Sequence, residues 1–210
     1  ASNNTAVGRN ALTANTTGAN NVAVGQNAIK TNTTGSHNVA VGASSLALNT
    51  TGSYNSAIGG DDTTGYPSLY SNTTGAYNVA LGNGALSKNT TADNNTATGY
   101  RALYANTTGA SNTAVGYGSL DANTTAANNT AVGRDSLGAN TTGAQNTAVG
   151  QSAGLGITTG DYNQAFGYQS MNGGAVTGAS NSAFGAQTLQ SLTSGANNVA
   201  VGRNALSLNT

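Results

Sequence analysis

Apolar residues recur along this chain at two fixed positions of a seventeen-residue period. One position directly precedes a recurring Gly and is usually Val, as at Val115; the other is the fourth residue after that Gly, as at Leu120. In the coil after Gly150 the second apolar residue is expected to shift to Leu155. A fixed period of this length indicates a repeat architecture. The recurring Gly residues are Gly8, Gly25, Gly42, Gly59, Gly82, Gly99, Gly116, Gly133, Gly150, Gly167, Gly185 and Gly202.

The polar positions keep the same period. The residue four before each recurring Gly is always Asn, the residue two before it is always Ala, and an "NTTG" motif such as 106–109 follows the apolar Leu. Asn, Thr and Gly are poor helix formers, and two-helix repeats need about twice this length. The "NTAVG" segment at 112–116 alternates, with Thr and Val on one face and Asn, Ala and Gly on the other, which predicts a short strand. A second short strand is expected around "AL", before the NTTG corner.

We therefore predict an all-β fold, a parallel β-solenoid or β-roll with 17-residue coils, about 12 in number, forming a single repeat domain over residues 1–210. An inserted loop at 60–65, "GDDTTG", lengthens one step but leaves the repeat in phase, and the step from Gly167 to Gly185 is one residue longer than the period. Asp61 and Asp62 in this loop could contact a cation, but two adjacent carboxylates are too few ligands, so a polar loop tip is expected.

Stacking of the coils explains the invariant positions without a ligand. Identical residues of successive coils form columns, so a column of Asn can form a hydrogen-bonded ladder. A column of Ala indicates that a neighbouring wall of the coil lies too close for a larger side chain, and a column of Gly indicates a corner of the coil. Val115 and Leu120 are expected in the core. The predicted structural ladder comprises Asn4, Asn21, Asn38, Asn55, Asn78, Asn95, Asn112, Asn129, Asn146, Asn163, Asn181 and Asn198.

Composition excludes several classes of function. The formal net charge is zero and charged residues make up 6% of the chain, so no electrostatic feature favours nucleic acid or an anionic membrane. No apolar run is long enough for a membrane span, and the absence of Cys removes disulfide and thiolate chemistry. His37 is the only His, there is no Glu, and the Asp residues are scattered. We therefore expect no enzyme activity, no cofactor and no metal.

The repeated "NxAVGxxAL…NTTG" pattern resembles the heads of trimeric autotransporter adhesins of the YadA type, and related repeats of phage tail fibres and bacterial surface fibres. The resemblance covers essentially the whole chain, although the usual motif of that family has one more residue between Asn and Gly and a shorter coil. It implies a left-handed β-roll, three chains associated side by side, and a head that binds molecules on a host surface.

These features predict a non-catalytic extracellular fibre segment, on a cell surface or a virion, that displays variable residues on a rigid rod for attachment to a surface glycan or protein receptor. A thin core favours burial against other chains, so a homo-oligomer is expected, with a trimer implied by the resemblance. The repeats run to both ends without a capping segment, which favours end-to-end stacking. A purely structural, self-assembling extracellular filament is therefore one alternative.

Side chains at the variable positions are the candidates for recognition. Exposed Tyr and Arg residues, together with Asn, suit contacts with carbohydrate or protein. The candidates are Tyr54, Tyr77, Tyr100, Tyr104, Tyr117, Arg134, Tyr162 and Tyr168.

The NTT motifs raise two further hypotheses. Each matches the N-glycosylation sequon, but glycans about 5 Å apart on successive coils would collide, so a structural corner is favoured. Repeated Thr also suggests an ice-binding β-solenoid, but adjacent Thr residues should point to opposite faces, which leaves one outward Thr column. The sequons begin at Asn15, Asn32, Asn49, Asn72, Asn89, Asn106, Asn123 and Asn140.

Overall fold

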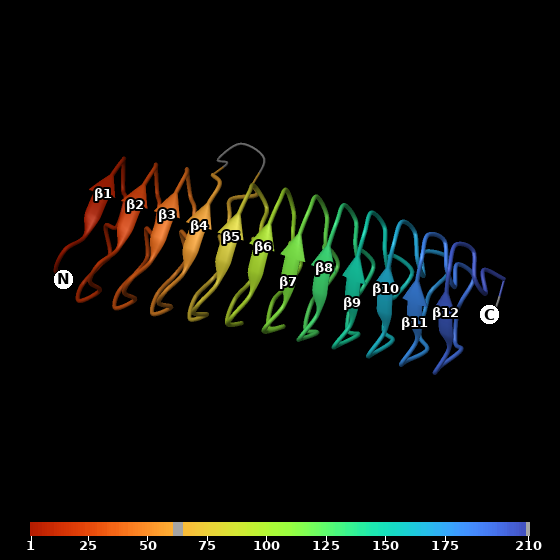
Figure 1. Cartoon of the computed structure of the whole chain (residues 1–210). Helices are drawn as coiled ribbons and strands as arrows, with labels where there is room; N and C mark the ends of the chain where they lie inside the picture. The colour runs from red at the N-terminus through yellow and green to blue at the C-terminus, as the bar shows by residue number, and fades with distance from the viewer. Residues whose placement is uncertain (61–64, 209–210) are drawn as a thin grey trace. The chain divides into compact units, whose positions relative to one another are not determined.

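The computed structural model describes residues 1–60 and 65–208, and within them the chain forms twelve three-residue strands and no helix. One strand falls in each coil, at the Thr-Ala-Val position of the repeat (Figure 1). The fold is a parallel β-solenoid, as the period predicts. The strands are β1 (Thr5–Val7), β2 (Val22–Val24), β3 (Val39–Val41), β4 (Ser56–Ile58), β5 (Val79–Leu81), β6 (Thr96–Thr98), β7 (Thr113–Val115), β8 (Thr130–Val132), β9 (Thr147–Val149), β10 (Gln164–Phe166), β11 (Ser182–Phe184) and β12 (Val199–Val201).

The chain divides into two compact units, residues 1–108 and 109–210. In the first unit β1 to β6 pair in sequence order, all parallel, and in the second β7 to β12 do the same. The register places equivalent residues opposite each other, for example Ala40 opposite Ala57 and Ala131 opposite Ala148. Each column of the sequence is therefore a physical column within its unit.

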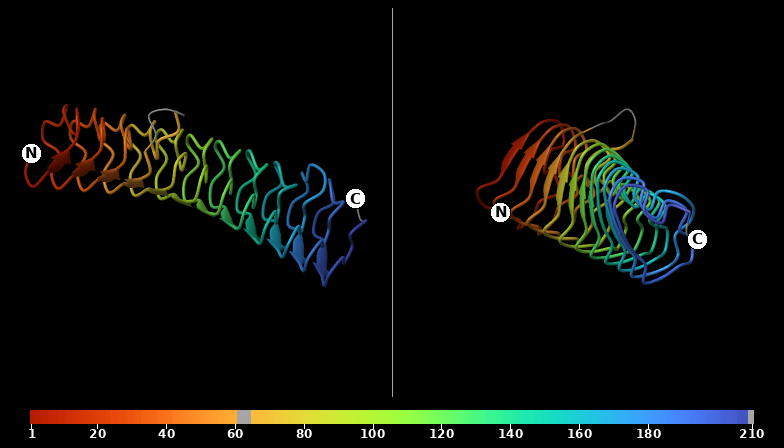
Figure 2. Two further views of the ribbon diagram at one scale, coloured as in Figure 1. Left: turned by 90° about the horizontal axis from the view of Figure 1, so that it is seen from above. Right: turned by 45° about the vertical axis from the view of Figure 1, so that its right-hand side comes forward.

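The winding is left-handed within each unit. In Figure 1 the strands point upward on the near side while successive coils advance to the right. The view from above in Figure 2 places the strands along the side that faced the viewer in Figure 1. This is the sense that the resemblance implied.

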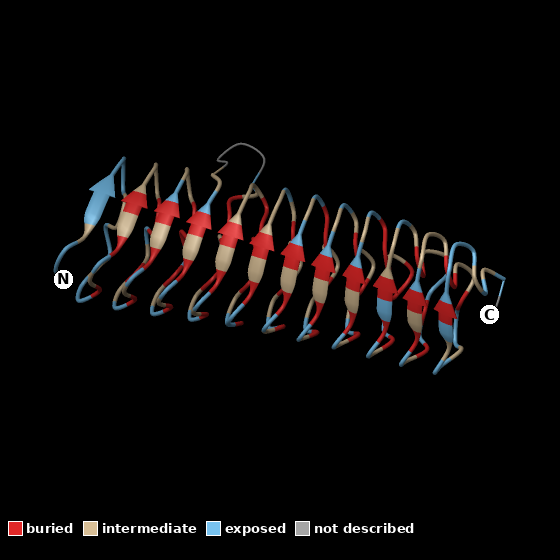
Figure 3. Ribbon diagram, viewed as in Figure 1, coloured by how far each residue is buried: buried red, intermediate tan, exposed pale blue. Residues whose placement is uncertain are grey.

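The interior is narrow and built from small side chains. The central residue of a strand, such as Ala114, is fully buried, as are the Asn before it and the Leu that follows the turn, Leu120. Val115 points outward and is 36% exposed, so the expectation that it belongs to the core is wrong. Because side chains alternate along a strand, burial of Ala and Asn forces Thr and Val to the surface. Figure 3 shows the buried centres of β2 to β12 between more exposed flanks, whereas β1 is exposed throughout.

The expected second strand does not form. Between the Gly and the NTTG motif, alternate residues adopt the left-handed conformation, with φ of 56° at Arg101 and 52° at Leu103. An extended segment cannot accommodate this alternation, so the chain turns, while its N–H groups still reach the next coil, as from Leu86 to Ala102 O at 3.0 Å. Left-handed Leu costs about 1–2 kcal/mol, which full burial of its side chain, at about 1.5–3 kcal/mol, offsets.

In one coil of the second unit, the position of the core Leu holds Gly, and the position of the NTTG Asn holds an apolar residue. Gly154 occupies the left-handed Leu position, with φ of 63°, and the buried Ile157 stands where other coils have the Asn of NTTG. The expectation that Leu155 enters the core is wrong, because Leu155 is half-buried and Ile157 supplies the missing volume. Ile157 pairs with Val176 of the next coil in a parallel bridge.

Candidate functional site

The invariant Asn side chains join successive coils inside the solenoid. The Oδ1 atom of Asn129 accepts a hydrogen bond from the backbone N–H of Asn146 at 2.9 Å, and its Nδ2 donates to the carbonyl of Gly143 at 2.9 Å. The same pair of bonds recurs in the first unit, where Asn21 accepts from the N–H of Asn38 and donates to Gly35 O. These amides satisfy backbone groups that would otherwise be buried and unpaired, so they are not available to a ligand.

The Asn residues of the NTTG motif form a second ladder. The Nδ2 of Asn32 donates to the Oδ1 of Asn15 at 2.8 Å and to the carbonyl of Gly35 at 2.9 Å. From Asn32 to Asn140 these side chains are fully buried. A buried amide whose two hydrogens are both bonded leaves no room for a glycan, so the sequons serve as corners in the folded chain.

The two Thr residues of NTTG face different surroundings. The hydroxyl of Thr33 donates to Thr50 O of the next coil at 3.0 Å, whereas Thr34 is exposed. Only one Thr of each motif therefore points outward, and NTTG does not create a Thr-x-Thr array.

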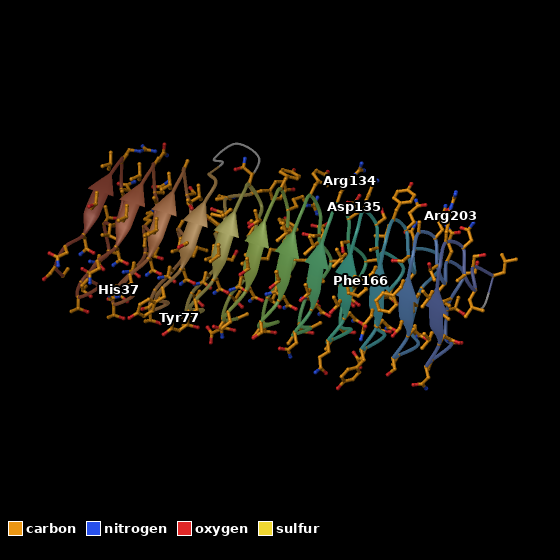
Figure 4. The ribbon with its side chains drawn as sticks, in the orientation of Figure 1. His37, Tyr77, Arg134, Asp135, Phe166 and Arg203 are labelled. Carbon is orange, nitrogen blue, oxygen red and sulfur yellow. The ribbon has the colours of Figure 1, made fainter. Side chains whose placement is uncertain are left out.

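Outward side chains gather along two edges of the strand face. The first edge is the residue directly before each ladder Asn. In the first unit it carries His37, Tyr54 and Tyr77, whose rings stack in parallel with centroids 4.7 and 5.0 Å apart. All three are in the left-handed region, and Figure 4 shows His37 and Tyr77 beside the beginnings of the strands. In the second unit the same position holds Tyr162, which is 55% exposed.

The second edge is the residue directly after each recurring Gly. It holds Tyr100 in the first unit, and Tyr117, Arg134 and Tyr168 in the second. The Arg134 guanidinium lies 6.0 Å from the centre of the Tyr117 ring and forms an ion pair with Asp135, at 3.0 Å between Nε and Oδ2. Figure 4 shows Arg134, Asp135 and Arg203 beyond the ends of the strands of their unit.

Tyr104 differs from the other candidates because charged neighbours cover it. The Lys88 ammonium and the Arg101 guanidinium lie 4.7 and 4.5 Å from its ring centre, and Tyr66 packs edge-on at 5.2 Å. The ring is half-buried in this cluster. Tyr104 therefore serves the packing of its own coils more than a contact with a ligand.

Sequence reasoning missed two aromatic residues on the strand face. Phe166 and Phe184 replace the outward Val of β10 and β11, and their rings stack with centroids 5.1 Å apart. Figure 4 shows Phe166 on the strand face of its unit. The missed signal was their position: two residues after Asn the repeat carries an inward Ala, so the third residue must point outward.

The described residues contain no cluster of side chains suited to bind a metal ion. Over residues 1–60 and 65–208, no three His, Cys, Asp or Glu side chains gather closely enough to hold a metal ion. Asp61 and Asp62 lie outside the described residues. In the same part of the chain no helix is long and apolar enough to cross a membrane.

No family model, curated protein or solved structure matches the chain. The resemblance to YadA-type heads therefore rests on the repeat motif alone.

Proposed function

We propose that this chain is a non-catalytic segment of an extracellular fibre, adhesin-like or tail-fibre-like, that attaches a cell or a virion to a surface glycan or protein. The observation that carries the proposal is the contrast between inward and outward positions. Inward Asn, Ala and Leu are nearly constant and occupied in packing, whereas the edges of the strand face carry varied Tyr, Arg and Gln side chains.

Rigid display follows from the ladders. Within each unit, successive coils are joined by backbone pairing and by side-chain bonds such as those of Asn38 and Asn49. Side chains on these coils keep a fixed order and spacing, so binding at one coil places the next near its own target. Linked weak contacts of this kind raise avidity without any single strong site.

Association of several copies is part of the proposal. In the first unit both outward positions of β2, β3 and β5 are apolar, as at Val39 and Val41. A flat apolar strip on a sheet favours burial against another chain, and the resemblance favours three chains side by side. End-to-end stacking into a purely structural filament is the alternative. Sedimentation equilibrium separates them: a fixed trimer supports the first, open-ended growth with concentration the second, and a stable monomer contradicts both.

Ice binding is a second candidate because β7, β8 and β9 place Thr113, Thr130 and Thr147 in register on their outward face. Regular Thr rows on a flat sheet can order water. Thermal hysteresis in a freezing-point measurement would favour this candidate, and its absence would remove it.

The attachment proposal is tested with beads that carry the full chain at high or low density, washed over cell surfaces and glycan-coated surfaces. Retention that rises steeply with bead density is expected for multivalent contact. No retention on any surface at the highest density would contradict the proposal.

A further inference from the structure

One coil of the second unit carries large side chains at all four outward positions. In residues 162–168, "YNQAFGY", the outward residues are Tyr162, Gln164, Phe166 and Tyr168. The neighbouring coil of β9 has Gln145, Thr147, Val149 and Gln151 at these positions. We call the four side chains of the β10 coil the aromatic row. The inward residues of this strand, Asn163 and Ala165, follow the repeat and are fully buried.

The aromatic row is open to solvent. Tyr162 and Tyr168 are 55% and 48% exposed, Gln164 is exposed, and Phe166 is partly exposed and stacks on the 39% exposed Phe184 of the next coil. Among the described residues neither Tyr162 nor Tyr168 has a ring or cation partner within stacking distance, in contrast to Tyr54, which is stacked on both faces.

Tyr162 lies in the left-handed region, with φ of 58°, as do the residues at the equivalent position of other coils, such as Gln145 and Asn128. Its backbone N–H donates to Ala144 O of the preceding coil at 3.1 Å, so the stacking of the coils holds this conformation. The repeat therefore fixes the direction in which the Tyr162 side chain leaves the edge of the strand face.

The side chains of the aromatic row suit an uncharged ligand. It contains no charged side chain, and the adjacent Asp161 is engaged, because its Oδ1 accepts a hydrogen bond from Ala144 N at 2.7 Å. Aromatic rings can pack against the apolar C–H faces of a pyranose, while the Tyr hydroxyls and the Gln164 amide can bond its hydroxyl groups.

We propose that the aromatic row binds a neutral oligosaccharide chain that lies across the solenoid along β10. The inference rests on the proposed attachment function and assigns it a ligand class and a place. The two tyrosines contact separate sugars of the chain at the two ends of the strand, Phe166 and Phe184 form the apolar floor, and Gln164 sets the orientation of the ligand by hydrogen bonding.

The test replaces the row with residues that the chain already uses in other coils: Tyr162→Asn, Gln164→Thr, Phe166→Val and Tyr168→Gln together. The four replacements occur at the equivalent positions as Asn128, Thr147, Val149 and Gln151, so the variant should unfold no earlier than the wild type. Its net charge is unchanged. The control is Tyr54→Asn, which removes one exposed Tyr from the same column in the other unit.

Binding is measured by titration calorimetry of the full chain with cellohexaose, mannohexaose, laminarihexaose and chitohexaose, and with heparin and sialylated oligosaccharides as anionic probes. We expect the wild type and the control to bind at least one neutral hexasaccharide, and the row variant to bind it at least tenfold more weakly.

Four outcomes would overturn the proposed site. Undiminished binding by the row variant would remove the site but leave the attachment function standing. Binding of anionic probes only would contradict the ligand class. A row variant that changes the sedimentation coefficient of the assembly, with glycan affinity unaltered, would identify a contact between chains. Absence of oligosaccharide binding also rejects the row, and bead retention then decides separately whether the attachment function survives.

Discussion

The backbone N–H of Asn146 donates to the side-chain Oδ1 of Asn129 on the preceding coil at 2.9 Å. Asn129 also donates to Gly143 O, so one buried amide satisfies two backbone groups of the neighbouring coil. No other side chain of this size offers both an acceptor and a donor with this geometry. The strict recurrence of Asn is therefore a requirement of stacking.

Replacing Asn129 with Ala should lower the free energy of unfolding by about 2–4 kcal/mol, because a buried N–H and a buried carbonyl lose their partners. Urea denaturation followed by circular dichroism measures the change. Thr142→Ala, on the exposed Thr column of the next coil, is the control and should change stability by less than about 0.5 kcal/mol. Equal effects of the two substitutions would contradict the ladder.

The recurring Gly is fixed by both conformation and space. At Gly133 φ is 131°, and an added Cβ would lie 2.5 Å from Gly150 O of the next coil. Gly133→Ala should therefore cost about 2–5 kcal/mol from overpacking and backbone strain. Gly118 provides the comparison, since its φ of 62° matches the position where other coils have Asn10 and Asp135. Gly118→Asn should change the unfolding midpoint little, and a loss as large as that of Gly133→Ala would refute the explanation.

Adjacent residues of β7 test which face of the strand is inside. Ala114→Val adds volume to a fully buried position and should cost about 1–3 kcal/mol. Val115→Thr changes an outward residue to the one that β6 carries as Thr98, and should alter stability by less than about 0.5 kcal/mol. Thermal unfolding of both variants gives the comparison. A larger loss of stability from Val115→Thr than from Ala114→Val would show that Val115 faces the core.

We predict energetic coupling between Gly154 and Ile157, which lie in the same coil. Asn140 Oδ1 is buried and has no hydrogen-bond partner among the described residues, because Ile157 stands where the next ladder Asn would donate. Gly154→Leu alone should overpack, since its added Cβ would meet Leu137 Cδ2 at 2.9 Å and Ile157 Cδ1 at 3.2 Å. Ile157→Asn alone should leave a cavity that costs about 2–5 kcal/mol.

The double variant restores both the core Leu and the ladder Asn of the other coils. It should be at least as stable as the wild type, with a coupling energy of about 0.5–3 kcal/mol between the two sites. A double-mutant cycle in urea measures this energy. Strictly additive effects would show that Gly154 and Ile157 do not compensate each other.

The repeat period revealed much of the fold because each residue of a coil mainly contacts its equivalents in the neighbouring coils. Parallel in-register pairing, the inward Asn ladder and the Ala wall follow from that single fact. The inward or outward placement of Val115 did not follow, because alternation separates two faces without saying which one is covered. The turn after the Gly was missed because a left-handed Leu, as at Leu103, contradicts local preference and is stabilised only by burial.

Sequence alone identifies candidate recognition residues where the repeat varies in polarity, as at Tyr168. It does not identify them where one apolar residue replaces another. Phe166 and Phe184 replace Val, an apolar residue that the sequence pattern places in the core. Their exposure follows only once the structure shows which face of the strand points outward. Tyr104 also stands at a variable position, but sequence alone does not show that cations cover its ring, because Lys88 comes from 16 residues before it and Arg101 from its own coil.

The most direct test of the central claim replaces all the exposed candidates at once, Tyr104 excepted, with residues that other coils carry at the same positions, and leaves every inward residue unchanged. Bead attachment and the thermal unfolding midpoint of this variant are measured beside those of the wild type. The account predicts that attachment is lost while the midpoint is kept. Undiminished attachment with an intact fold would show that the outward columns do not carry the function.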